Sequence, residues 1–165
     1  MTKHLDYLGI FKKFNDLKID YLVVGGLAVN FHGIPRMTYD VDLAIKLTRG
    51  NILKVIRQLA EWGYKPKAPV QPEEFADPKA RARWMKEKNM KAFNFYHHEQ
   101  PVAEIDLVFD LPVSYSRLKA NVIYIEVSGE PIPVIRIQDL IAVKTKSGRK
   151  QDLSDVENLK RIMEK

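Results

Sequence analysis

The spacing of hydrophobic residues changes several times along the chain and predicts alternating helices and strands. Apolar residues at helical spacing predict helices over residues 4–17, 27–32, 51–62, 79–87, 113–119, 137–146 and 153–163. Alternating or continuously apolar runs predict strands over residues 19–24, 39–47, 90–97, 102–109, 121–127 and 132–135, the last two joined as a hairpin. Prolines between residues 66 and 78 predict a loop. This interspersed order predicts an α/β (α+β) fold, a mixed β-sheet flanked by helices.

The length of the chain and the lack of a recognisable linker indicate one domain. A chain of 165 residues can bury a hydrophobic core but is short for two ordinary domains, and no linker interrupts it. We expect one domain over residues 1–165, with C-terminal helices, about residues 137–163, packed on the sheet. No apolar run is long enough for a membrane span and the first residues do not resemble a signal peptide, so we expect a cytoplasmic protein with no membrane partner.

Two aspartates share one face of the strand predicted over residues 39–47. Asp40 and Asp42 are two residues apart, so their side chains point to the same side of a strand. The opposite face would hold the apolar residues Val41, Leu43, Ile45 and Leu47. Paired carboxylates suit Mg²⁺, which prefers oxygen ligands. The alternative is an ordinary half-exposed strand that carries two aspartates.

A third carboxylate lies on the strand predicted over residues 102–109. Its apolar face is formed by Ala103, Ile105, Leu107 and Phe109, and its other face carries Glu104, Asp106 and Asp110. If this strand neighbours the first one, Asp106 joins Asp40 and Asp42. Three such carboxylates can hold two divalent ions that stabilise an in-line phosphoryl displacement.

A glycine pair, Gly25–Gly26, separates the buried strand over residues 19–24 from the following helix. Glycines at such a turn let backbone N–H groups approach a phosphate closely, although ordinary turns use the same pair.

The order of these features resembles the DNA polymerase beta-type nucleotidyltransferase superfamily. The resemblance rests on a strand, Gly25–Gly26, the Asp40-x-Asp42 pair after a gap of 13 residues, and Asp106 on a later strand. Further along, Asp139…Lys144 and Gly148-Arg149-Lys150-x-Asp152 are similar to a minimal branch that contains abortive-infection and toxin–antitoxin nucleotidyltransferases. The resemblance covers roughly residues 19–160.

This resemblance implies transfer of a nucleoside monophosphate from an NTP to an acceptor hydroxyl, with release of pyrophosphate. It implies that Asp40, Asp42 and Asp106 bind Mg²⁺ or Mn²⁺ and carry catalysis. It also implies that the nucleotide is bound by Gly25, Gly26, Arg36, Thr38 and Lys144. The superfamily often has serine where this chain has Gly26, so a hydroxyl contact to phosphate is lost there.

The net charge of +6 is concentrated in two stretches. Residues 79–91 carry a net charge of +5 and residues 136–150 a net charge of +4. With Trp84 and Phe93 nearby, the stretch from Lys79 to Lys91 is compatible with contacts to tRNA or another RNA acceptor. A solvated helix surface explains the same charges. A cognate protein such as an antitoxin is a further possible partner.

Several alternatives stay open from the sequence. The chain has no cysteine, which excludes disulfides, thiolate metal sites and thiol catalysis. A non-catalytic module that binds nucleic acid or a partner protein, and a phosphodiester hydrolase with the same carboxylates, are both compatible with the pattern. Asp152 and Asp155 fit either a functional role or simple stabilisation of the first turn of the last helix.

Overall fold

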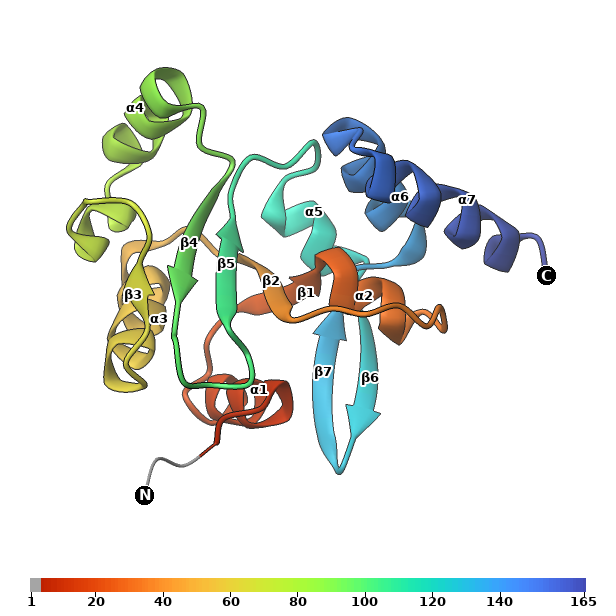
Figure 1. Cartoon of the computed structure of the whole chain (residues 1–165), viewed down its shortest axis with the longest axis horizontal. Coiled ribbons are helices and arrows are strands. Elements are labelled where there is room, and N and C mark those ends of the chain that lie inside the picture. The colour runs from red at the N-terminus through yellow and green to blue at the C-terminus, as the bar shows by residue number, and fades with distance from the viewer. Residues whose placement is uncertain (1–3) are drawn as a thin grey trace.

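A mixed seven-stranded sheet forms the centre of the computed structural model, which describes residues 4–165 (Figure 1). The strands are β1 (Tyr21–Val24), β2 (Asp40–Ile45), β3 (Lys65–Pro66), β4 (Ala92–Tyr96), β5 (Glu104–Val108), β6 (Ile123–Val127) and β7 (Glu130–Val134). Their order in the sheet is β3-β4-β5-β2-β1-β7-β6. The pairs β2–β5 and β1–β7 are parallel, and the other neighbours are antiparallel. The predicted mixed sheet with flanking helices is confirmed.

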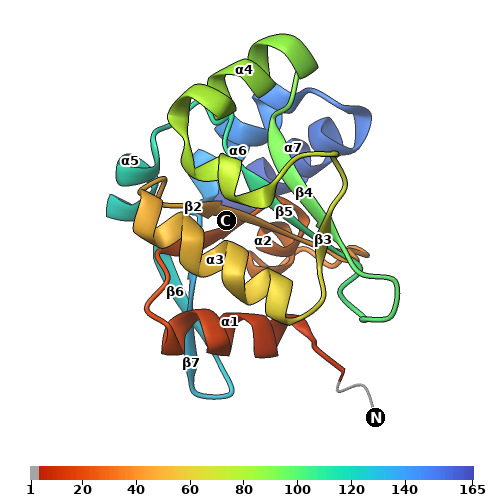
Figure 2. The same ribbon diagram turned by 90° about the vertical axis from the view of Figure 1, so that its left-hand side faces the viewer.

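Helices cover the sheet on both sides. They are α1 (Tyr7–Asp16), α2 (Gly25–Phe31), α3 (Arg49–Glu61), the 3-10 helix η1 (Pro72–Ala76), α4 (Pro78–Lys88), α5 (Tyr115–Ala120), α6 (Ile137–Ser147) and α7 (Lys150–Met163). Figure 2 shows α1 and α3 in front of the strands and α6 and α7 behind them. The helices α6 and α7 pack against each other, and α2 contacts β1, β2 and α6. None of these helices is long and apolar enough to cross a membrane.

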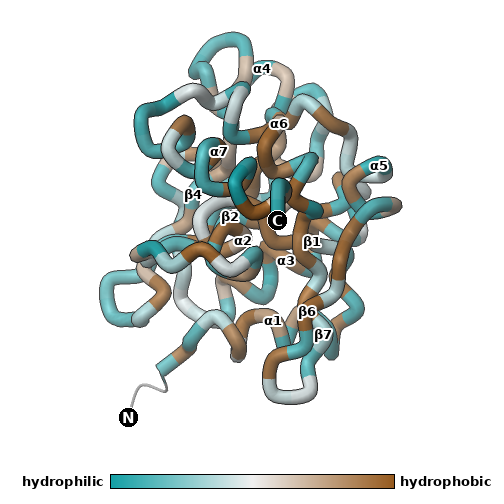
Figure 3. The backbone as a smooth tube through the Cα atoms, turned by 90° about the vertical axis from the view of Figure 1, so that its right-hand side faces the viewer, coloured by the Kyte–Doolittle hydropathy of each residue, from teal (hydrophilic) through white to brown (hydrophobic). Residues whose placement is uncertain are grey.

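The alternating pattern of β2 and β5 separates the core from the polar face. Val41 and Leu43 on β2 and Ile105 and Leu107 on β5 are buried, so the residues between them point to the other side of the sheet. Figure 3 shows hydrophobic residues gathered in β1 and α6 and hydrophilic ones in α4 at the edge of the molecule. The core thus fixes which side of the two strands is free for polar chemistry.

Three details of the sequence interpretation are wrong. Leu47 is 37% exposed instead of buried, because β2 ends at Ile45 and the chain turns toward α3. Trp84 is buried, with its ring centroid 5.1 Å from that of the buried Phe93, so it cannot stack on a nucleic-acid base. The segment predicted as loop contains β3 and η1, because a two-residue strand at the sheet edge tolerates proline and η1 begins with Pro72.

The helices α2, α3, α4 and α7 begin one to three residues earlier than predicted, and the structure gives a reason for α2 and α7. The helix α2 starts at Gly25, whose φ of +74° lets the chain leave β1 and turn directly into the helix. The helix α7 starts at Lys150 because Asp152 accepts a hydrogen bond from the backbone N–H of Arg149 and forms a capping box.

Asn51 joins α3 to the ends of two central strands. Its side chain is buried, accepts a hydrogen bond from the N–H of Asp20 at 2.8 Å, and donates to the carbonyls of Asp20 and Lys46 at 2.9 Å each. These bonds hold the segment before β1 beside the segment after β2.

We expect Asn51→Ala to lower the free energy of unfolding by about 2–4 kcal/mol, because buried backbone groups lose their partners. Urea denaturation measures this loss. The matched control is Asn121→Ala, which removes a single exposed bond to the Arg117 carbonyl and should change stability by less than about 1 kcal/mol. Equal effects of the two variants would contradict the prediction.

Candidate active site

The parallel register of β2 and β5 brings four carboxylates onto one face of the sheet. Asp40 lies opposite Glu104, and Asp42 lies opposite Asp106. Carboxylate oxygens of Asp40, Glu104 and Asp106 all lie within 4.8 Å of one another, and Asp42 and Asp106 lie close enough to share a hydrogen bond when one of them is protonated. The expectation that the two strands are neighbours is confirmed.

The sequence interpretation did not select Glu104 for this site. It lies two residues before Asp106 on the same strand face, a spacing that repeats that of Asp40 and Asp42. Its side chain forms an ion pair with Lys67, which follows the edge strand β3. The spacing was a usable signal for Glu104, whereas nothing in the sequence links Lys67 to it.

The four carboxylates disfavour one another's charge. Burial, followed by the charge of Asp42 and that of Glu104, raises the pKa of Asp106 to about 7, although a hydrogen bond from Asn94 Nδ2 at 2.7 Å opposes the shift. Burial and the charges of Glu104 and Asp106 also raise the pKa of Asp40. Burial raises the pKa of Asp42. Clustered hard oxygen donors that repel one another fit a divalent cation, which would supply the missing positive charge.

The glycine turn is shaped by the nearest of these carboxylates. A Cβ atom on Gly25 would lie 2.0 Å from Asp42 Oδ2, and Gly25 has a φ of +74°. A Cβ on Gly26 would lie 3.1 Å from Thr38 Oγ1 and 3.4 Å from the Arg36 guanidinium. The backbone N–H of Gly26 also donates to Asp42 and lowers its pKa against the larger effect of burial. The pair therefore makes room for Asp42 at the start of α2.

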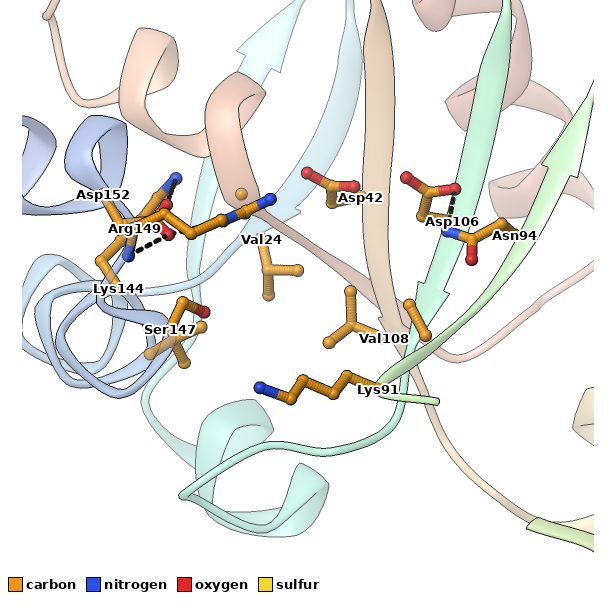
Figure 4. Close-up of a pocket in the computed structure, with 13 residues that line it drawn as sticks. Val24, Asp42, Lys91, Asn94, Asp106, Val108, Lys144, Ser147, Arg149 and Asp152 are labelled. Carbon is orange, nitrogen blue, oxygen red and sulfur yellow. Dashed lines mark hydrogen bonds and ion pairs between the residues drawn. The ribbon is translucent and has the colours of Figure 1, made fainter. Parts of the chain in front are cut away.

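Cations from the C-terminal helices face the carboxylates across the cleft (Figure 4). Lys144 on α6 is 6% exposed and lies near enough to Asp42 to lower its pKa. Its Nζ also pairs with Asp152 Oδ1 at 3.2 Å and Asp155 Oδ2 at 3.0 Å. Arg149 follows α6 and is exposed, with its Nε 2.9 Å from Asp152 Oδ2. Lys144, which the resemblance implies binds nucleotide, is thus already paired within the protein.

Two adjoining cavities of about 340 and 290 Å³ lie between the carboxylates of β2 and β5 and these cations. Both are lined by Asp42, Asp106, Lys144, Arg149 and Asp152. The larger one extends to Lys91, whose side chain enters the cleft from the side away from Asp42 in Figure 4. The residues predicted from the sequence to bind metal or nucleotide all line one or both cavities, namely Gly25, Gly26, Arg36, Thr38, Asp40, Asp42, Asp106 and Lys144.

Burial of Asp152 does not neutralise it. Desolvation would raise its pKa, but hydrogen bonds from Arg149 and Lys144 outweigh that effect and hold the pKa below its usual value. The side of the cleft formed by α6 and α7 is therefore a network of charged groups. Its cations, Lys144 and Arg149, suit an anionic ligand.

Comparison with known proteins identifies the fold. No described protein family and no curated protein matches the sequence. Among solved structures, the lincosamide antibiotic adenylyltransferase LnuA in its lincomycin-bound form is similar, with a TM-score of 0.64 and 18% identity over 94% of this chain and 95% of that one. A putative nucleotidyltransferase from Thermotoga maritima is similar with a TM-score of 0.56 and 16% identity over 98% and 96% of the two chains.

A third similar structure is that of ANT(2″)-Ia in complex with adenylyl-2″-tobramycin, with a TM-score of 0.50 and 11% identity over 93% of this chain and 90% of that one. The chain therefore has the fold of nucleotidyltransferases, as the resemblance in the sequence implied.

The repulsion between carboxylates predicts that Asp106→Asn stabilises the protein in EDTA. An amide keeps bonding partners in Asn94 and Asp42 but removes one negative charge. Because the pKa of Asp106 is raised to about 7, its stabilising contribution is complete below the unfolded value of 3.8 and is lost as the pH rises through about 7. Above about pH 7 we therefore expect the variant to melt roughly 2–4 °C higher than the wild type.

Thermal melts from about pH 4 to pH 8 measure this difference, which should shrink toward the acidic end. The exposed control Asp16→Asn should show no such pH dependence. A gain for Asp106→Asn that is constant over this range, or none at all, would refute the repulsion argument.

The close approach of Gly25 to Asp42 gives a second expectation. Gly25→Ala should be less stable than Gly33→Ala by at least about 1 kcal/mol. Gly33 has a similar positive φ of +97° but no atom within 4 Å of an added Cβ, so it reproduces the backbone strain without the clash. Urea denaturation of both variants separates the two effects, and equal losses would show that the contact with Asp42 does not matter.

Proposed function

We propose that the protein transfers a nucleoside monophosphate from an NTP to an acceptor hydroxyl and releases pyrophosphate. One observation carries the proposal: the carboxylates of β2 and β5 and the cations of α6 and α7 face each other across one cleft that begins at Gly25–Gly26. The nucleotidyltransferase fold supports the same reaction class.

Asp40, Asp42 and Asp106 are the residues that would hold Mg²⁺ or Mn²⁺, with Glu104 beside them. Bound there, the divalent ions supply positive charge to the transferred phosphoryl group and to the leaving pyrophosphate.

The other groups of the cleft bind the triphosphate and orient the residues that react with it. Lys144 and Arg149 bind the triphosphate by charge, and Thr38, whose Oγ1 donates to the Asp40 carbonyl at 3.2 Å, keeps the start of β2 in place. The acceptor oxygen attacks the α-phosphorus, the bond from that phosphorus to the β-phosphate oxygen breaks, and pyrophosphate leaves. The hydroxyl proton passes to a carboxylate oxygen of Asp106, which Asn94 orients from β4.

We infer that the acceptor is a small molecule that carries a hydroxyl group. Two structures of similar length support this class, one with lincomycin bound and one with adenylyl-2″-tobramycin. An RNA end is the second candidate, because Lys79, Arg83 and Lys86 on α4 are exposed and have no acidic partner within the described residues 4–165. Lys91 continues this charge into the cleft.

The test is incubation with each α-³²P-labelled NTP, Mg²⁺ or Mn²⁺, and a panel of aminoglycosides, lincosamides and RNAs. Label should appear on one acceptor, and Asp42→Asn should reduce transfer at least about 100-fold because the transition state loses charge stabilisation. Asp16→Asn on the exposed surface of α1 is the control and should retain full activity.

Other outcomes identify the alternatives. Release of free NMP without a labelled acceptor would indicate a phosphodiester hydrolase. RNA binding that is lost on charge reversal of Arg83 and Lys86 but unchanged in Asp42→Asn, with no transfer, would indicate a non-catalytic binding module.

A further inference from the structure

Two buried aspartates on α7 connect three cations that come from separate parts of the chain. We call these three the cation cluster: Arg36, Lys144 and Arg149. We propose that Asp152 and Asp155 are positioning residues that hold the cation cluster in the arrangement that binds the triphosphate. This inference rests on the proposed function and assigns α7 a part in it.

Asp155 is the centre of the network. Its Oδ2 accepts a hydrogen bond from Arg36 Nη1 at 2.6 Å and forms an ion pair with Lys144 Nζ at 3.0 Å, and its Oδ1 accepts a hydrogen bond from Gln151 Nε2 at 3.2 Å. The residue is only 2% exposed, so these partners replace the water that a carboxylate otherwise binds. One carboxylate thereby ties the loop before β2 to the helix α6.

Asp152 completes the network on the other side of the lysine. It lies 3.2 Å from Lys144 Nζ and 2.9 Å from Arg149 Nε, and it is also 2% exposed. Lys144 therefore sits between two fixed carboxylates, and its ammonium group has little freedom to move. A lysine on a flexible four-carbon stem needs such fixation to act as a phosphate ligand at a defined place.

Helix stabilisation accounts for only part of this arrangement. Asp152 caps α7 through the N–H of Arg149, but Asp155 lies beyond the first turn and makes no bond to a free backbone N–H of the helix. A buried ion pair is also weak evidence for stability, since apolar residues of similar volume often serve as well. The sequence left open whether these aspartates are functional or only stabilise the first turn of the helix. Capping explains part of the role of Asp152 and does not explain Asp155.

The charges of the network point into the cleft. Three cations contact two carboxylates, so these five groups together carry a net charge of +1. Arg36, Lys144, Arg149 and Asp152 all line the cavity that also holds Asp40, Asp42 and Asp106. A polyphosphate in the cleft meets cations whose positions are already set, so that little side-chain entropy is lost on binding.

The effect of removing a carboxylate has opposite signs under the two possible roles. If Asp155 contributed only its negative charge, Asp155→Asn would make the cleft more positive and tighten the binding of an anion. If Asp155 positions the cation cluster, the variant releases Lys144 and Arg36, and binding weakens. The sign of the change therefore distinguishes a positioning role from a purely electrostatic effect of the carboxylate.

The experiment is isothermal titration calorimetry of the full chain with inorganic tripolyphosphate at millimolar Mg²⁺. We expect Asp155→Asn to weaken binding at least about tenfold, since charge-assisted hydrogen bonds are lost. Glu157→Gln is the matched control, because it removes the same charge from an exposed position of the same helix, and it should leave the affinity within about twofold of the wild type. Circular dichroism reports whether each variant is folded.

A second variant covers the case in which Asp155→Asn does not fold. Asp155→Glu keeps the charge but moves the carboxylate by one methylene group. We expect it to bind tripolyphosphate more weakly than the wild type does. If Asp155→Asn folds, we expect Asp155→Glu to bind more tightly than Asp155→Asn does. Equal or tighter binding in either folded variant overturns the proposal, as does a wild type that does not bind tripolyphosphate. Tripolyphosphate binding with the expected losses, but without NMP transfer to any acceptor, would refute the proposed function and leave this inference standing.

Discussion

The parallel pairing of β2 with β5 is the constraint on which the site depends. It sets Asp40 opposite Glu104 and Asp42 opposite Asp106, and the buried residues between them prevent these side chains from turning into the core. Burial, together with the negative charges of Asp42 and Glu104, raises the pKa of Asp106 to about 7. A protein that only needed a stable sheet would gain nothing from this arrangement, so it indicates a site that takes up positive charge.

Lysines from other elements lie next to these carboxylates at two places. Lys67 pairs with Glu104 at the β3 edge, and Lys144 approaches Asp42 from α6. The two helices α6 and α7 form a wall of alternating charge, in which buried carboxylates hold cations that would otherwise be mobile. The cleft therefore has a wall that suits metal ions and a wall that suits phosphate, which is the combination that nucleotidyl transfer from an NTP requires.

Much of this could be predicted because it depends on short-range patterns. The period of two in residues 40–45 and 103–108 places the aspartates on one face of each strand whatever the partner strand is. The turn at the glycine pair after β1 could be predicted for the same reason, because it depends only on neighbouring residues. Prediction failed where a tertiary contact decided the outcome: Trp84 lies in a basic, polar stretch but packs against Phe93 in the core.

The strand faces, the carboxylates and the turn at Gly25–Gly26 follow from the sequence alone, because each depends on residues a few positions apart. Which distant groups share the cleft depends on how whole elements pack together. Arg36 and Asp155 are 119 residues apart, and their 2.6 Å contact exists because α7 folds back over the loop before β2. No local pattern encodes such a pairing, since it arises from the packing of whole elements, and for the same reason the role of the C-terminal aspartates could not be read from the sequence.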